Sequence, residues 1–327
     1  MIGSPLRKLR RQRGAALLLA MIVMTLVATL AAAMVWHQAR AVQLEAAERA
    51  RAQAGWILDG AVDWAREIWR RNAADSPSGQ QPWDLEVAEG RLSSFLATDR
   101  EQSADVAVDA FLAGRVEDAQ SRYNLRNLVD GSGKLVEVEV LALRRLFEAL
   151  GLPGSPEALA LELARAWGPV QPGSAQPRPL SPTRIEHLAW LGVDERTLSR
   201  LRTVADILPE RTPVNLNTAS REVLYAVLPG ADMGAAARLV REPRNRFKSL
   251  QDVRARNIVP VEVLDPDNPA HQARVAVGSS HVRVIASIRL EDRVLTETAL
   301  LRRTGAGGAA TVETVRRERR AGVPGRP

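Results

Sequence analysis

The sequence predicts an α+β protein in which a long N-terminal helix packs on an antiparallel sheet, with a large all-α insertion interrupting that sheet. Three observations predict this class. An uncharged apolar run near the N-terminus leads into a segment rich in Ala, Glu, Arg and Gln, with no proline before Pro77. Residues alternate with a period of about two both early and late in the chain. The block between these two regions lacks that alternation.

The apolar run from Ala15 to Trp36 contains no charged residue. As a helix it would extend over roughly 33 Å, about the thickness of the hydrocarbon core of a bilayer. A secretory signal has an apolar region of only about 7–15 residues, so we expect this run to be retained as a transmembrane segment. Five basic residues precede it. By the positive-inside rule they hold the N-terminus in the cytoplasm and place the following residues outside it.

We expect the same helix to continue to about Asn72, because the segment after Trp36 consists mainly of helix-forming residues. Two neighbouring rows of residues predict the face that packs on the folded body. They are Ile57, Ala61, Trp64 and Ile68, and beside them Leu58, Val62, Ala65 and Trp69.

Strands and short helices are predicted after this helix. Val106, Val108 and Val116 lie in alternating runs, and "DGSG" at 130–133 predicts a turn. Residues 134–260 are expected to form short helices between segments rich in Gly and Pro. Alternation returns in "VGSSHVRVIASIRLEDRVLTETALLRR", where "LEDR" predicts the turn of an antiparallel hairpin. The simplest arrangement joins the early and late strands in one sheet.

Composition excludes several classes of function. The 327 residues include no cysteine, which excludes disulfides, thiolate metal sites and cysteine nucleophiles. The net charge of +7 is concentrated at the ends, since the leader contributes five positive charges and residues 302–327 a net five, leaving −3 for residues 14–301. The last stretch has few large apolar residues, so we expect a disordered basic tail.

Catalytic and metal-binding patterns are weak. The four histidines are scattered, and neither a nucleophile elbow nor a complete phosphate-binding loop is present, so we do not expect an enzyme. Oxygen-rich clusters at Asp118, Asp130, Asp265 and Asp267 are weak candidates for a calcium site. The sequence around these residues does not match a twelve-residue calcium loop. We favour the alternative that these side chains form turns or cap helices. No other cofactor is expected.

Three segments together resemble the minor pseudopilin K (GspK) family of type II secretion, over nearly the whole chain up to Arg303. They are the junction "RQRGAALLLAMIV", the acidic-then-asparagine segment "VEDAQSRYNLRNLV", and "LGVDERTLSRLRTVADILPERTPVNLNTASREVLYAVLPG" followed by "FKSLQDV". Arg126 stands where a second asparagine is usual. Gly168 and Pro169 follow Trp167, where the family commonly has acidic residues, which argues against any family calcium site that uses those acids.

The resemblance implies that prepilin peptidase cleaves between Gly14 and Ala15 and that Ala15 becomes a methylated terminus. It implies a pilin-like fold with an insertion of sterile-alpha-motif or helix-hairpin-helix type. The expected place is the inner membrane, with a periplasmic body that caps the pseudopilus tip and aids export of folded proteins across the outer membrane. Minor pseudopilins of the I and J kinds and the major pseudopilin are the expected partners.

Leu19 is the residue from which we predict a position at the fibre tip. It stands five residues into the mature chain, where most pilin-like proteins have a glutamate that pairs with the terminus of the neighbouring subunit. An unpaired buried carboxylate costs several kcal/mol, and a subunit at the tip lacks that neighbour. Leucine avoids this cost.

The expected division of the chain follows from these segments. It comprises a leader (1–14), a transmembrane part (15–36), a pilin body with the helix and first strands (37–133), a helical insertion (134–268), the final strands (269–303) and the disordered tail (304–327).

A membrane-anchored DNA receptor of the competence type is the alternative. "VNLNTASREVLYAVLPGADMGAAARLV" also resembles a helix-hairpin-helix, whose P-G-x-G turn binds phosphate through backbone N–H groups. Asp232 occupies the position of the second glycine. Its carboxylate would repel phosphate, so we do not expect nucleic acid as a partner.

Overall fold

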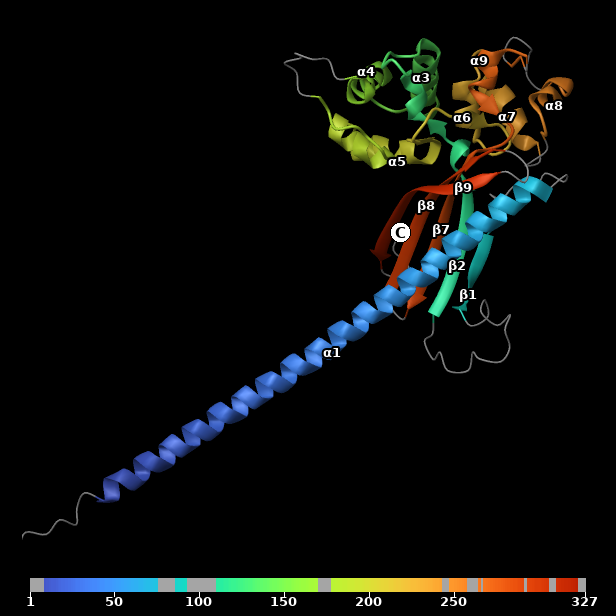
Figure 1. Ribbon diagram of the computed structural model, residues 1–327. Helices are drawn as coiled ribbons and strands as arrows, with labels where there is room; N and C mark the ends of the chain where they lie inside the picture. The colour runs from blue at the N-terminus through green and yellow to red at the C-terminus, as the bar shows by residue number, and fades with distance from the viewer. Residues whose placement is uncertain are drawn as a thin grey trace, which may run out of the picture. The chain divides into compact units, whose positions relative to one another are not determined.

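The computed structural model of the protein describes residues 9–75, 86–92, 110–169, 178–242, 247–257, 264–265, 267–290, 293–305 and 310–322 (Figure 1). The chain divides into two compact units, Met1–Ile57 and Leu58–Pro327. Val106, Val108 and the turn residues Glu291 and Asp292 lie outside the described residues.

The first unit contains the N-terminal part of a single long helix, α1 (Leu9–Asp75). All side chains of residues 15–46 are exposed. The hydroxyls of Thr25 and Thr29 donate to backbone carbonyls three residues earlier, so neither needs water as a partner. Among the described residues, this helix alone is long and apolar enough to cross a membrane, over Ala15–Arg71.

The second unit is built on a five-stranded antiparallel sheet in the order β1-β2-β7-β8-β9. Its strands are β1 (Glu86–Arg91), β2 (Ala110–Asp118), β7 (His281–Leu290), β8 (Arg293–Thr304) and β9 (Thr311–Gly322). The predicted β7–β8 hairpin is confirmed, because Leu290 pairs with Arg293. The predicted union of early and late strands is also confirmed, since β2 pairs with β7 along its whole length. Strand β1 was not expected.

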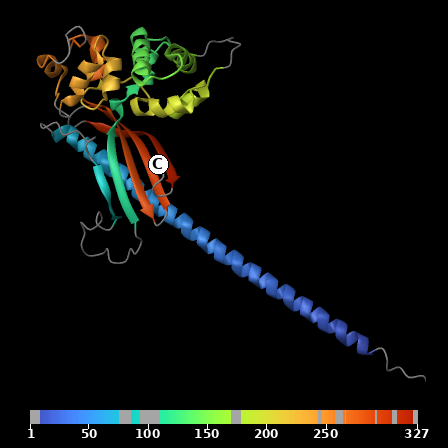
Figure 2. The same ribbon diagram turned by 180° about the vertical axis from the view of Figure 1, so that it is seen from behind.

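The C-terminal part of α1 covers one face of this sheet. Val62, Ala65 and Trp69 are buried against apolar residues of the sheet, which are Val116, Val282, Val284, Ala299 and Leu301. Figure 1 looks onto this face, and Figure 2 shows the sheet from the other side. Of the two predicted rows, the one containing Trp69 forms the packing face. The assignment of Trp64 to that face was wrong, because its side chain is 55% exposed.

The prediction of a disordered tail over residues 304–327 was wrong, because β9 lies within it and pairs with β8 (Figure 1). Val312 of this strand packs on the core under α1, and ion pairs provide further contacts. Glu297 on β8 is fully buried, and both Arg317 and Arg319 bind its carboxylate, with Arg317 Nε 3.0 Å from Oε1. Arg319 also contacts Asp59 of α1 at 2.9 Å. These partners are distant in sequence and close only in the fold.

The chain between β2 and β7 forms a helical domain. Its helices are α3 (Glu137–Leu150), α4 (Pro156–Trp167), α5 (Glu195–Val204), α6 (Arg221–Val227), α7 (Met233–Arg241), α8 (Leu250–Ala255) and α9 (Pro269–Gln272), with 3-10 turns η2 (Ala119–Ser121), η3 (Leu125–Leu128) and η4 (Ile185–Leu191). Two short parallel pairs join its ends, β3 (Tyr123–Asn124) with β4 (Ala205–Asp206) and β5 (Val214–Asn215) with β6 (Val275–Ala276).

The predicted limits of this domain, 134 and 268, were too narrow. Tyr123, Leu125 and Leu128 before it, and Val275 after it, are buried in the same core as the helices. Their alternating pattern resembles that of the sheet strands. The tertiary structure assigns them to the helical domain because their apolar side chains are buried against α3, α4 and α6.

Candidate functional site

The residues predicted for processing and assembly lie in the exposed part of α1. The backbone is helical without a break through Gly14 and Ala15, and the Leu19 side chain is 64% exposed. Cleavage at this junction, methylation of Ala15 and a role for Leu19 in assembly remain predictions.

Asp118, the first calcium candidate, lies buried where β2 enters the helical domain. Its carboxylate accepts hydrogen bonds from the Gln120 backbone at 2.8 Å, from Asn215 Nδ2 at 2.7 Å and from Thr218 Oγ1 at 2.5 Å. Burial raises the pKa of Asp118, and these donors oppose that shift. The carboxylate is therefore surrounded by donors, and its surroundings do not fit a cation.

Asp130 shapes the predicted "DGSG" turn. Its Oδ1 accepts from the backbone N–H groups of Ser132 and Lys134 and from the Ser132 hydroxyl, all at 2.8–2.9 Å. The Ser132 hydrogen bond lowers the pKa of Asp130. Gly133, with a φ of +85°, closes the turn against Gly168 and Pro169, where a Cβ would meet Pro169 Cδ at 2.4 Å. The two glycines thus permit a close backbone contact at the point where the family pattern has acids.

Asp265 and Asp267 form a local turn. Asp265 Oδ1 accepts from the Asp267 backbone at 3.0 Å, and the Asp265 N–H donates to His271 Nδ1 at 2.8 Å. In the described residues no group of three or more His, Asp or Glu side chains gathers as metal ligands. Asp118, Asp130 and Asp265 each hold a turn or a buried junction, and the Asp267 carboxylate lies 3.5 Å from Arg254 Nη1. Calcium binding at these residues stays a prediction.

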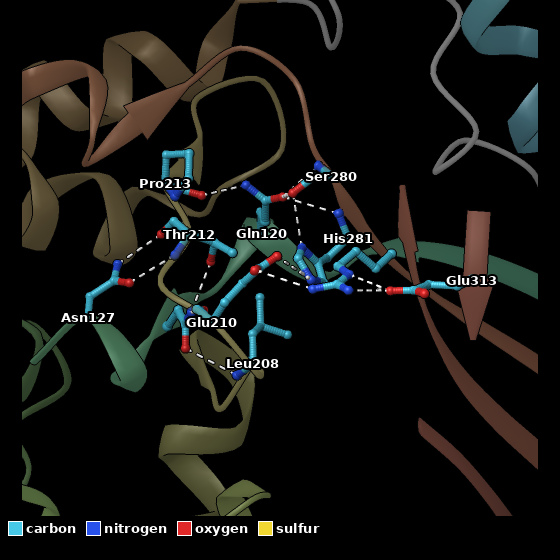
Figure 3. A network of polar contacts seen from close by, with 11 residues as sticks. Gln120, Asn127, Leu208, Glu210, Thr212, Pro213, Ser280, His281 and Glu313 are labelled. Atoms are coloured by element: carbon cyan, nitrogen blue, oxygen red, sulfur yellow. Dashed lines mark hydrogen bonds and ion pairs between the residues drawn. The ribbon is translucent and has the colours of Figure 1, made fainter. Parts of the chain in front are cut away.

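The densest polar cluster lies where the sheet meets the helical domain, and Figure 3 shows part of it. Gln120, in the turn after β2, donates from Nε2 to the carbonyl of Pro213 at 2.7 Å. Its Oε1 accepts from the backbones of Ser280 and His281 at 2.6 and 3.1 Å. One buried side chain thus joins the end of β2, the loop before β5 and the start of β7.

Asn124 and Asn127 hold the loop at 208–212, and Figure 3 shows Asn127 beside Thr212. Asn124 donates to the Glu210 carbonyl at 2.7 Å and accepts from the Leu208 N–H at 3.1 Å. Asn127 bonds both backbone groups of Thr212, at 2.8 and 3.0 Å. An asparagine side chain can pair with both groups of a peptide, which satisfies buried backbone that has no strand partner.

The asparagines of "NLNTAS" extend this cluster, which we call the asparagine hub (Gln120, Asn124, Asn127, Asn215 and Asn217). Asn215 is fully buried and donates to Asp118 and to Ser279 Oγ at 2.7 and 3.1 Å. Asn217 bonds the backbone of Phe247 in both directions and also donates to the Val277 carbonyl. The sequence motifs of this chain therefore mark backbone junctions, and no reacting group lies among them.

His281 is a buried titratable residue beside the asparagine hub. Burial lowers its pKa, and the nearby Glu210 carboxylate, 3.6 Å from Nε2, partly opposes the shift, whereas Arg302 adds to it. Its Nδ1 lies 3.0 Å from Ser280 Oγ, and Nε2 has no hydrogen-bond partner among the described residues. Its position as the first residue of β7 was visible in the sequence, but its burial was not.

The segment that resembles a helix-hairpin-helix has its phosphate-binding position occupied. Asp232 caps α7, and its carboxylate accepts from the Ala235 N–H at 2.6 Å. The carbonyls of Tyr225 in α6 and of Ala231 in the turn bind the Arg145 guanidinium. A backbone N–H that would bind a phosphate oxygen therefore already binds a carboxylate, which disfavours the DNA-receptor alternative.

Comparison with known proteins shows which sequences this chain resembles. The family profile "Type II secretion system (T2SS), protein K" matches residues 214–272. "Type II secretion system protein K" of Pseudomonas aeruginosa is 26% identical over 303 residues, covering 87% of this chain and 86% of that protein. The Klebsiella pneumoniae protein of that name is 31% identical over 159 residues, covering 48% of this chain and 44% of that protein.

A solved structure has a similar fold. It is a crystal structure of the GspK-GspI-GspJ complex from the type 2 secretion system of enterotoxigenic Escherichia coli. One of its chains matches with a TM-score of 0.58 and 18% identity, covering 84% of this chain and 98% of that chain. The similarity confirms the α+β fold with a helical insertion.

Proposed function

From the match of residues 214–272 to the type II secretion system protein K profile, and from the similar proteins of that name, we propose that this chain is a non-enzymatic minor pseudopilin that caps the tip of a periplasmic pseudopilus. In this role it would aid the export of folded proteins across the outer membrane. The N-terminus would lie in the cytoplasm, α1 would cross the inner membrane, and the second unit would lie in the periplasm.

The position of the helical domain within the second unit carries the proposal. Trp69, near the C-terminal end of α1, lies under the Arg303 guanidinium, with 5.3 Å from the guanidinium carbon to the ring centre. Arg303 in turn donates from its backbone to the Ser280 carbonyl at the exit of the helical domain. The helical domain therefore occupies the end of the sheet that the last turns of α1 reach. A subunit stacked beyond that end would collide with it.

Leu19 supports the same position. Its side chain belongs to an uncharged helix surface, which is suited to lipid or to an apolar bundle of helices. A glutamate there would need the terminal ammonium of a neighbouring subunit as its partner. A subunit that begins the fibre has no such neighbour, so leucine removes the cost of an unpaired charge.

The related Escherichia coli structure is named for a complex with GspI and GspJ, and we propose equivalent I and J partners for this chain, above the major pseudopilin. Co-expression with those partners should give a complex with one copy of this chain at one end only. Leu19→Glu should not increase incorporation into fibres relative to the matched variant Leu18→Glu. Repeated copies of this chain in the complex, or a specific gain with Leu19→Glu, would contradict the proposal.

A further inference from the structure

A cavity of about 420 Å³ lies between the helical domain and the sheet. Three arginines line it, Arg126, Arg178 and Arg316, and apolar side chains such as Leu208 and Leu300 form its walls. No carboxylate is among its described lining residues. This volume is typical of sites that bind small molecules.

Arg126 is the central cation of the cavity. Its guanidinium carbon lies 4.8 Å from the centre of the Trp167 ring, so a cation–π interaction stabilises the group there. Within the described parts of the chain its guanidinium has no hydrogen-bond or ion-pair partner. Burial alone lowers the pKa of Arg126. A half-buried guanidinium without an acceptor is costly, and its N–H donors remain available to a ligand.

The other two arginines are partly engaged. Arg178 donates from Nε and Nη2 to the Ala166 carbonyl, at 3.1 and 2.7 Å, which leaves Nη1 unused by that contact. Arg316 donates from Nη1 to the Thr183 carbonyl. Burial lowers the pKa of Arg316, Asp206 and Glu318 oppose that shift, and Arg283 and Arg184 add to it. These backbone contacts position the two side chains at the cavity without neutralising them.

We propose that this cavity binds an organic anion, in which a carboxylate or phosphate group is carried on a small apolar body. The planar guanidinium of Arg126 matches the paired oxygens of such a group. The apolar walls favour a hydrocarbon body over a free inorganic ion, which would leave those walls in contact with water. Nothing in the proposed role at the fibre tip requires this ligand, so the two proposals are independent.

Isothermal titration calorimetry on the full mature chain in a neutral detergent tests the site. The probes are 3-phenylpropionate and phenyl phosphate, with inorganic phosphate and the neutral 3-phenylpropionamide as controls at equal ionic strength. We expect one of the two organic anions to bind, and to bind at least about tenfold more tightly than either control. Which of the two binds more tightly distinguishes a carboxylate from a phosphate ligand.

Variants identify the responsible side chain. Arg126→Gln should weaken binding by at least about tenfold, whereas Arg126→Lys, which keeps the charge and loses the planar fork, should give a smaller loss. Arg196→Gln on the exposed surface of α5 is the matched control and should leave the affinity within about twofold. Equal binding of the anion and the amide by the unaltered chain would overturn the proposal, even if Arg126→Gln fails to fold. So would an unchanged affinity in a folded Arg126→Gln variant, or no binding of either organic anion.

Discussion

At the scale of single residues, the asparagines of this chain act as substitutes for backbone. Asn124 and Asn127 bind peptide groups of a loop more than eighty positions later in the chain. A buried peptide group without a partner costs about 1–3 kcal/mol, so the asparagine hub fixes how the helical domain joins the sheet. The motif that resembles the family signature therefore has a structural role.

Asn124→Ala should lower the free energy of unfolding by about 2–4 kcal/mol, because it leaves the buried Leu208 N–H and the partly buried Glu210 carbonyl without their partner. Asn268→Ala, which removes only the exposed cap of α9, should cost about 1 kcal/mol or less. Urea unfolding followed by tryptophan fluorescence measures both. Equal losses in the two variants would show that the hub is not a principal junction.

His281 predicts how stability depends on pH. Its pKa in the folded chain lies below that of an unfolded histidine, because burial of the imidazole outweighs the attraction of Glu210, and Arg302 adds a smaller repulsion. Between these two pKa values the unfolded chain binds more protons, so stability is present above about pH 6.5 and is lost as the pH falls below it.

The measurement is urea unfolding at pH 5 and pH 7.5 for the unaltered chain and for His281→Gln. We expect the free energy of unfolding to differ less between the two pH values in the variant, because His281 is absent. Some difference should remain, because His187, whose pKa is also lowered, is present in both proteins. The same pH dependence in the variant would exclude His281 as its source.

At the scale of elements, β9 shows a strand that is stabilised by charge. Arg317 and Arg319 face Glu297 and α1, whereas Arg320 lies largely exposed, 3.1 Å from Glu318. Removing one partner of a buried ion pair costs more than removing an exposed one, because it leaves a charge without compensation.

Arg319→Gln should therefore lower stability by about 1–3 kcal/mol and speed amide hydrogen exchange in β8 and β9. Arg320→Gln, one position along the same strand, should change stability by less than about 0.5 kcal/mol. Hydrogen exchange with mass spectrometry on both variants checks this. If the two behave alike, β9 is not stabilised through Glu297.

The sequence predicted those elements whose pattern is visible within a few neighbouring residues. It did not predict elements that depend on contacts with residues far away in the sequence. The uncharged run of α1, the β7–β8 hairpin and the helical block each have a period or a turn that is visible within a few residues. Strand β9 was read as disordered because its stabilising partners, Glu297 and Asp59, are distant in sequence. The Tyr123–Val129 segment was placed in the wrong domain because its burial depends on helices that follow it.

The site could be predicted less completely than the fold. Asp118, Asp130, Asp265 and Asp267 were identified as oxygen clusters, and composition could not show which donors already bind each carboxylate. Gln120 gave no signal, because a glutamine becomes informative only when the three backbone segments that it joins are known. The cavity around Arg126 could not be predicted either, since its three arginines come from segments far apart in the sequence.

At the scale of the whole molecule, the exposed apolar part of α1 can act in the membrane or in a fibre only if the mature protein retains it. Intact-mass measurement on the chain extracted from membranes should give a protein that begins at Ala15 with one added methyl group. Replacing Gly14 by a bulky residue should leave the leader attached, whereas the same change at Gly3 should not. A mature chain that begins at Met1, or beyond Trp36, would contradict retention of a processed α1.

The central claim is that this chain occupies the tip of a fibre, because its helical domain lies at the end of the sheet where a further subunit would stack. Gold labelling of this chain on isolated pseudopili, viewed by electron microscopy, tests that claim most directly. We expect a single label at one end of each fibre and none along its length. Labels repeated along the fibre would contradict the tip position.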